Sequence, residues 1–192
     1  MDTTEISTIY PKTLAEWRNW LKEYHLQENA VWVIFYKSGS GMPTISYDEA
    51  VEEALCFGWI DSKAQAIDAS SRRQYFSKRK PKSAWSKSNK IRVEKLINEG
   101  RMTDAGMKCI EIAKANGSWD SLNDIEEMKI PNDFELKLNE APEAKLFFES
   151  LSKSVKQNML WWIASAKKKE TRNARINEIV TCAQQKKKPK QF

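Results

Sequence analysis

Long apolar runs, histidines and closely spaced cysteines are all scarce in this chain of 192 residues. No apolar run approaches the roughly 20 residues that a membrane-spanning helix needs. The single histidine, His25, excludes any site that requires two histidines of one chain, such as the zinc site of an H-E-x-x-H protease. His25 ends an amphipathic stretch, and in the last turn of a helix it is expected to interact favourably with the helix dipole.

The three cysteines, Cys56, Cys109 and Cys182, are widely spaced and form no C-x-x-C pair, which argues against a zinc ribbon or a disulfide framework. Neither G-x-x-x-x-G-K-[ST] nor G-x-G-x-x-G occurs, so no nucleotide-binding glycine motif is present. The first residues carry acids and no apolar stretch, unlike a secretory signal. We therefore expect a cytoplasmic globular protein that needs no metal or other cofactor.

The formal net charge of +6 is concentrated in two segments. Residues 72–101 hold eleven Lys or Arg and two acids, and residues 167–192 hold nine Lys or Arg and two acids. The rest of the chain has a net charge of −10. The last residues, 187–192, are expected to form a solvated basic tail, as chain ends often do.

Hydrophobic periodicity predicts an α+β fold, in which a small antiparallel three-stranded sheet packs on helices and an all-helical C-terminal region follows. Strands are expected over 31–37, 59–67 and 72–77, where β-branched, aromatic or alternating residues gather. Capping-box spacings at Thr13 and Ser46 predict two helix starts. The predicted divisions are a core domain (1–117), a connecting segment with a short helix (118–140), a helical region docked on the core (141–186) and the tail (187–192).

Four pieces of the sequence together resemble a known family. They are Phe35-Tyr36-Lys37-Ser38-Gly39, Ala54-Leu55-Cys56-Phe57-Gly58-Trp59-Ile60-Asp61-Ser62, Arg79-Lys80-Pro81-Lys82-Ser83, and Trp162-Ile163 with Glu170-Thr171-Arg172 and Arg175-Ile176. Over about residues 12–185 the chain resembles the YdeI/OmpD-associated (bacteriocin-protection, OmdA-like) family. The resemblance implies a role in resistance to antimicrobial peptides or bacteriocins and assigns no catalytic residues.

The motifs contain polar residues with no evident packing role, which suggests a binding site. We expect acids, cations and two indole rings to line one cleft, where opposite charges keep each other ionised. The candidate ligand-binding residues are Lys37, Glu49, Glu53, Trp59, Asp61, Arg79, Lys80, Trp85 and Asn89. The alternative is a structural ion-pair network with buried tryptophans, because such networks resemble sites. Cys56 follows acidic residues that raise a thiol pKa, so a structural thiol is favoured over a nucleophile.

Three functions remain open from the sequence. The first is a non-catalytic binding protein for a small molecule or a cationic peptide, which suits the acidic face of residues 49–56 and the family resemblance. The second is a nucleic-acid-binding protein that uses the basic and aromatic segment 72–101. The third is an enzyme that uses carboxylates near Asp61 for acid–base chemistry. The first is preferred, and catalysis is not expected.

Overall fold

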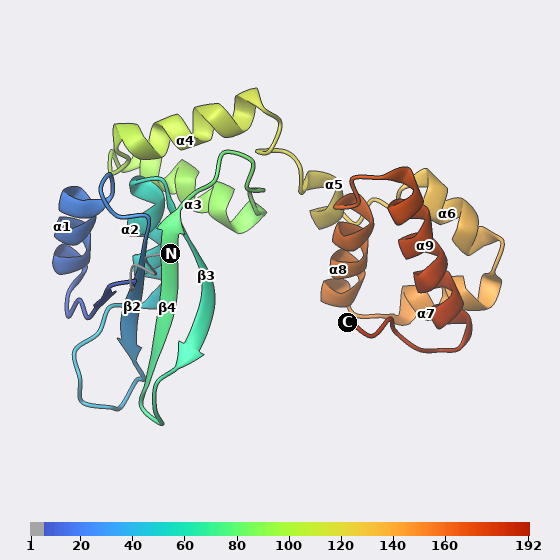
Figure 1. Cartoon of the computed structure of the whole chain (residues 1–192), viewed down its shortest axis with the longest axis horizontal. Coiled ribbons are helices and arrows are strands. Elements are labelled where there is room, and N and C mark those ends of the chain that lie inside the picture. Colours follow the sequence, from blue (N-terminus) through green and yellow to red (C-terminus); the bar gives the residue numbers. More distant parts are fainter. Residues whose placement is uncertain (1–5) are drawn as a thin grey trace, which may run out of the picture. The chain divides into compact units, whose positions relative to one another are not determined.

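The computed structural model describes residues 6–192, and the chain divides into two compact units, one ending at Asp120 and the other beginning at Ser121. Residues 1–5, which open the predicted 1–117 domain, lie outside the described residues. Unit 1 contains a β-sheet and four helices, and unit 2 contains helices (Figure 1). The predicted α+β class is confirmed.

The sheet of unit 1 has four strands rather than the three that were predicted. The order is β1-β2-β4-β3, and β4 lies between β2 and β3 (Figure 1). The pairs β2–β4 and β3–β4 are antiparallel as predicted, but β1 pairs with β2 in parallel. The prediction missed β1 because two residues are too few to show an alternating pattern. The bounds are β1 Thr8–Ile9, β2 Ala30–Tyr36, β3 Trp59–Ala66 and β4 Ser71–Lys78.

Three helices of unit 1, α1, α2 and α3, begin where the sequence supplies a capping side chain. The hydroxyls of Thr13, Ser46 and Ser86 each accept a hydrogen bond from the backbone N–H three residues later, which satisfies a donor that has no partner within the helix. Ser46 and Glu49 complete the predicted capping box. The bounds are α1 Leu14–Tyr24, α2 Tyr47–Cys56, α3 Lys87–Asn98 and α4 Asp104–Ala115.

The core of unit 1 forms between the helices and one face of the sheet. Successive strand residues point to opposite faces, and the fully buried strand residues Val31, Val33, Phe76 and Trp59 share one of them. The same apolar cluster includes residues of all four helices. The opposite, outer face holds alternate residues that are mostly half-buried or exposed, such as Tyr75. The outer face is therefore the side of the sheet that the helices leave uncovered.

Unit 2 has an apolar core of its own. Phe134 and Phe148 pack edge to face at a ring-centroid distance of 5.2 Å, and Arg172 forms an ion pair with Asp133 at 2.6 Å. Residues of the predicted connecting segment form α5 and α6 here, while docking of the helical region on the core stays a prediction. The bounds are α5 Asn123–Glu126, α6 Asn132–Asn139, α7 Pro142–Ser150, α8 Lys153–Ala164 and α9 Lys169–Gln184. Across residues 6–192, every helix is too short or too polar to cross a bilayer.

The close approach of α4 to the end of α2 requires a glycine at position 106. A Cβ added to Gly106 would lie 2.4 Å from the backbone oxygen of Cys56 and 2.8 Å from that of Leu55. The hydroxyl of Thr103 donates to the same Cys56 oxygen at 2.6 Å, so this oxygen is fixed in position. Only a residue without a side chain fits between the two helices at this point.

We predict that Gly106→Ala destabilises unit 1 by about 2 kcal/mol, because the clash of an overpacked interface exceeds the roughly 1 kcal/mol that alanine gains over glycine in a helix. Urea denaturation followed by tryptophan fluorescence measures this difference. Lys108→Ala, an exposed change in the same helix, is the control and should leave stability nearly unchanged. A variant more stable than the wild type would contradict the close approach.

Candidate functional site

The carboxylate of Glu53 is almost fully buried and is paired with two arginines. The residue is 2% exposed, and its oxygens lie 2.5 Å from Arg18 Nη1 and 2.5 Å from Arg101 Nη2. A buried charge is tolerated only when it is paired and hydrogen-bonded. Glu53 therefore joins α1, α2 and the segment between α3 and α4, and it raises the pKa of the Arg101 guanidinium.

The other acids of α2 are also engaged. Glu52 pairs with Lys95 at 2.9 Å, and Asp48 pairs with Arg92 at 2.6 Å. Glu49 accepts the backbone N–H of Ser46 at 2.9 Å, and this bond lowers the pKa of its carboxyl group. The acids of α2 thus cap the start of the helix and form ion pairs with α3.

Cys56, at the end of this face, is buried in the core. Burial, assisted by the charge of Glu53, raises the pKa of its thiol to about 11. At neutral pH the sulfur is therefore a protonated thiol, which is a weak nucleophile. This agrees with the structural role favoured by the sequence.

Asp61 has partners other than the predicted cations. Its carboxylate accepts the hydroxyl of Tyr47 at 2.6 Å and the side-chain amide of Gln74 at 3.2 Å. Burial, with this hydrogen bond next in importance, raises the pKa of Tyr47 to about 12. Asp61 therefore links β3 to the start of α2 and to β4.

The two predicted indole walls belong to the core. Trp59 is fully buried and donates its Nε1–H to the backbone oxygen of His25 at 3.3 Å. Trp85 is also buried, and the guanidinium carbon of Arg79 lies 3.6 Å from the centre of its ring. Trp85 therefore supports a cation and does not present an open aromatic wall.

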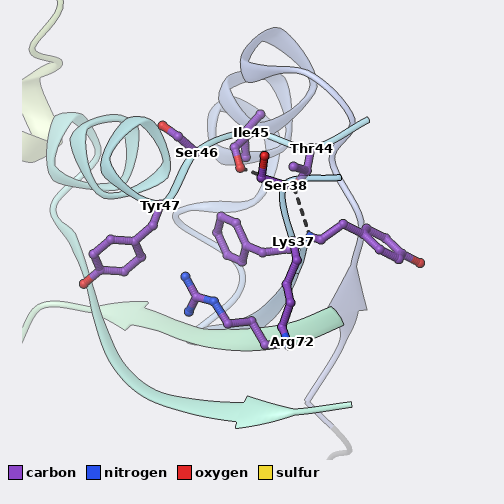
Figure 2. A pocket seen from close by; sticks show the side chains of 9 residues that line it. Lys37, Ser38, Thr44, Ile45, Ser46, Tyr47 and Arg72 are labelled. Carbon is purple, nitrogen blue, oxygen red and sulfur yellow. Dashed lines mark hydrogen bonds between the residues drawn. The ribbon is translucent and has the colours of Figure 1, made fainter. Parts of the chain in front are cut away.

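Lys37 lines a cavity of about 390 Å³ at the other end of β4. Figure 2 shows Arg72 extending its guanidinium toward the ring of Tyr47 in this cavity. Lys37 and Arg72 are its charged lining residues, and the remaining ones are apolar or carry hydroxyl groups. Asn89 lies elsewhere, in the first turn of α3, where its side-chain oxygen accepts from Arg92 at 3.3 Å.

A larger cavity, of about 660 Å³, lies on the outer face at the end of the β3–β4 pair. Three successive cations, Lys78, Arg79 and Lys80, contribute to it, and none of the acids within residues 6–192 lines it. The lining residues are Asn29, Ala30, Ile60, Ser62, Tyr75, Ser77, Lys78, Arg79, Lys80, Pro81 and Ser83. This composition of cations and hydroxyl groups suits an anionic ligand.

An aromatic and cationic cluster, Trp32, Lys63, Arg73 and Tyr75, adjoins this cavity on the outer face. Trp32 and Tyr75 are direct neighbours on β2 and β4, with ring centres 5.1 Å apart. Lys63 Nζ lies 5.1 Å from the Tyr75 ring centre, and the Arg73 guanidinium carbon lies 4.5 Å from that of Trp32. Such distances allow cation–π attraction, which holds both cations against the sheet.

The candidate residues thus fall into separate groups. The structure brings Arg79 and Lys80 together beside Trp85, whereas each carboxylate of the predicted cleft has other partners. Sequence reasoning missed Lys63 and Trp32 as site residues. The sequence of β2 is apolar throughout and does not show which face Trp32 occupies. A register irregularity between Asp61 and Ala64 positions Lys63, and no sequence pattern revealed it.

We predict that Glu53→Gln destabilises unit 1 by about 3 kcal/mol, because removal of one partner leaves two partly buried arginines without their carboxylate. Asp48→Asn, which removes an acid that is 72% exposed, is the matched control and should cost less than about 1 kcal/mol. Urea denaturation of both variants gives the comparison. Equal losses in the two variants would show that burial of Glu53 does not matter.

Comparison with protein families assigns both parts of the chain. Residues 9–109, more than half of the sequence, match a family described as Domain of unknown function (DUF8412). Residues 127–186 match the family described as Bacteriocin-protection, YdeI or OmpD-Associated, which confirms the resemblance over this region. Searches of curated proteins and of solved structures gave no match. The chain belongs to the DUF8412 family and carries a YdeI/OmpD-associated domain in its C-terminal part.

Proposed function

We propose that unit 1 is a non-catalytic binding module whose outer sheet face takes a single strand of nucleic acid. The observation that carries the proposal is the cluster of Trp32, Lys63, Arg73 and Tyr75 on the face that the helices leave uncovered. Proteins that bind single strands without sequence preference combine cations that follow the backbone with aromatic rings on which bases stack.

The positive charges of this face are not neutralised by the acids that the structure describes. Among the described residues, no carboxylate forms an ion pair with Lys63, Arg73, Lys78, Arg79 or Lys80. Asp61 is the one acid of β2, β3 and β4, and it faces the helices through its bond with Tyr47. Within the part of the chain that the structure describes, the acids of the sheet therefore do not offset electrostatic attraction to a polyanion on this face.

The proposal narrows the segment expected from the sequence. Within 72–101, Arg92, Lys95 and Arg101 pair with acids of α2, and Trp85 is buried in the core. The part left for a ligand is therefore within 72–82, extended across the sheet by Lys63, while the buried ring of Trp32 supports Lys63 and Arg73 from below. Tyr75 is half-buried, so part of its ring is open to stacking.

The other two expected functions have less support. A cationic peptide needs free acids, but the acids of α2 are engaged with arginines, a lysine and the helix cap. The paired-carboxylate chemistry expected near Asp61 gains no support, because the partners of Asp61 are Tyr47 and Gln74. Resistance to bacteriocins, as the family description suggests, stays compatible with a module that binds nucleic acid.

We predict that the full chain binds a labelled single strand of about 12 nucleotides, with fluorescence anisotropy as the measurement. The double variant Lys63→Ala/Arg73→Ala should bind at least about tenfold more weakly, and the slope of log affinity against log salt should fall by about 1.4. Tyr75→Ala should lose about 5- to 100-fold, the usual range for removal of one stacking ring.

The matched control is Lys22→Ala/Lys108→Ala, which removes the same charge from exposed positions of α1 and α4. It should lower the affinity much less than the sheet variant. Equal losses in the two double variants would mean that net charge alone attracts the strand, and no binding at low salt would refute the proposal. Binding of a polymyxin-like cationic peptide in place of the oligonucleotide would favour the first function instead.

A further inference from the structure

We propose that the 660 Å³ cavity beside this face is a phosphate-binding site in which Arg79 is the central ligand. The inference rests on the proposed function in one respect: the phosphate site would lie on the same face that is proposed to bind the nucleic-acid strand. The phosphate belongs either to the nucleic-acid strand or to a small phosphorylated molecule. Both sources share the chemistry that the cavity recognises, and the experiment below distinguishes them.

Arg79 is a buried cation with unused hydrogen-bond donors. The residue is 9% exposed, and within residues 6–192 its Nε and Nη1 have no acceptor. Its Nη2 donates to the backbone oxygen of Ala84, and its guanidinium stacks on Trp85. Buried polar atoms in native proteins are nearly always paired, so an orphaned pair of donors on a buried charge calls for an acceptor from outside the chain.

The surrounding chain holds Arg79 in place. Its backbone N–H donates to the oxygen of Gly58 at 2.9 Å, which fixes the start of the loop after β4. The side chains of Asn116 and Ser118, which follow α4, donate hydrogen bonds to the backbone oxygen of Pro81 at 2.8 Å and 3.2 Å. An anion therefore meets a guanidinium that is already ordered, which reduces the entropy lost on binding.

The cavity offers further partners for a phosphate. Lys80 is exposed at its edge, and Lys78 is held by the backbone oxygen of Leu26 at 2.7 Å. The hydroxyls of Ser62, Ser77 and Ser83 add donors around the cations. Several cations and hydroxyls match the higher charge and the greater number of acceptor oxygens of a phosphate better than those of a carboxylate.

Burial lowers the pKa of Arg79 to about 10, because the low-dielectric surroundings disfavour the charged form. A guanidinium with this pKa is still charged at neutral pH. The side chain of this lining residue thus remains a cation, and a bound anion would raise its pKa again.

The test is a titration of the full chain with inorganic phosphate, observed through the arginine Nε–H signals in ¹H–¹⁵N NMR spectra. Loss of one signal in Arg79→Lys assigns the signal of Arg79. We expect phosphate to shift this signal in the wild type, and Lys80→Ala to weaken the phosphate affinity about tenfold. Lys82→Ala is the matched control, because this exposed lysine of the same loop is not among the residues that line the cavity. The phosphate titration itself is made on the wild type and does not depend on the folding of any variant. If Arg79→Lys unfolds, spectral editing assigns the Arg79 signal instead.

Two results would overturn the inference: no shift of the Arg79 signal at saturating phosphate, or equal affinities in Lys80→Ala and Lys82→Ala. If the oligonucleotide binds through Tyr75 while phosphate leaves Arg79 unaffected, the phosphate site fails and the proposed function stands. If phosphate and a nucleoside monophosphate bind while the oligonucleotide does not, the site stands with a small molecule as its source and the proposed function fails. Competition between phosphate and the oligonucleotide assigns the site to the strand.

Discussion

The buried carboxylate of Glu53 is the interaction on which the arrangement of unit 1 depends. It joins α1 through Arg18 and the segment after α3 through Arg101, while Glu52 and Asp48 extend the same contact to α3. A buried ion pair of this kind adds little net stability, because desolvation offsets the attraction, but loss of one partner is costly. The network therefore determines how the helices pack against one another, and it adds little to the stability of the folded state.

The same network determines where the free charge of the unit lies. The carboxylates of α2 take up the cations of the helical layer, so the cations of β3, β4 and the following loop are left without acidic partners among the described residues. The sheet alternates, and its apolar residues are used on the side that packs against the helices. Among the described residues, the outer face is consequently positively charged and left uncovered by the helices of unit 1, although the sequence as a whole mixes many acids with its bases.

Much of the fold could be predicted from the sequence because its signals are local. The capping residues Thr13 and Ser46 and the β-branched and aromatic run of β2 are patterns within a few residues. The site was harder to predict because its contacts are not local. The partners of Glu53 lie 35 and 48 residues away in the sequence. The face of the sheet on which Lys63 lies depends on a register irregularity in β3. The acids of the predicted cleft instead bond to other groups, Glu53 to Arg18 and Arg101, Glu49 to Ser46, and Asp61 to Tyr47 and Gln74.

Arg79 is the residue at which folding stability and the proposed binding of an anion oppose each other. A buried guanidinium with two unused donors and no carboxylate lowers the stability of the folded state, since its hydration is lost and only partly replaced. Stacking on Trp85 and the anchored loop keep the group in place in spite of this cost. An anion that binds the folded chain and not the unfolded one recovers the missing interactions and stabilises unit 1 by mass action. The hydrogen bonds that Arg79 does not form in the folded chain would thus contribute to the affinity for the anion.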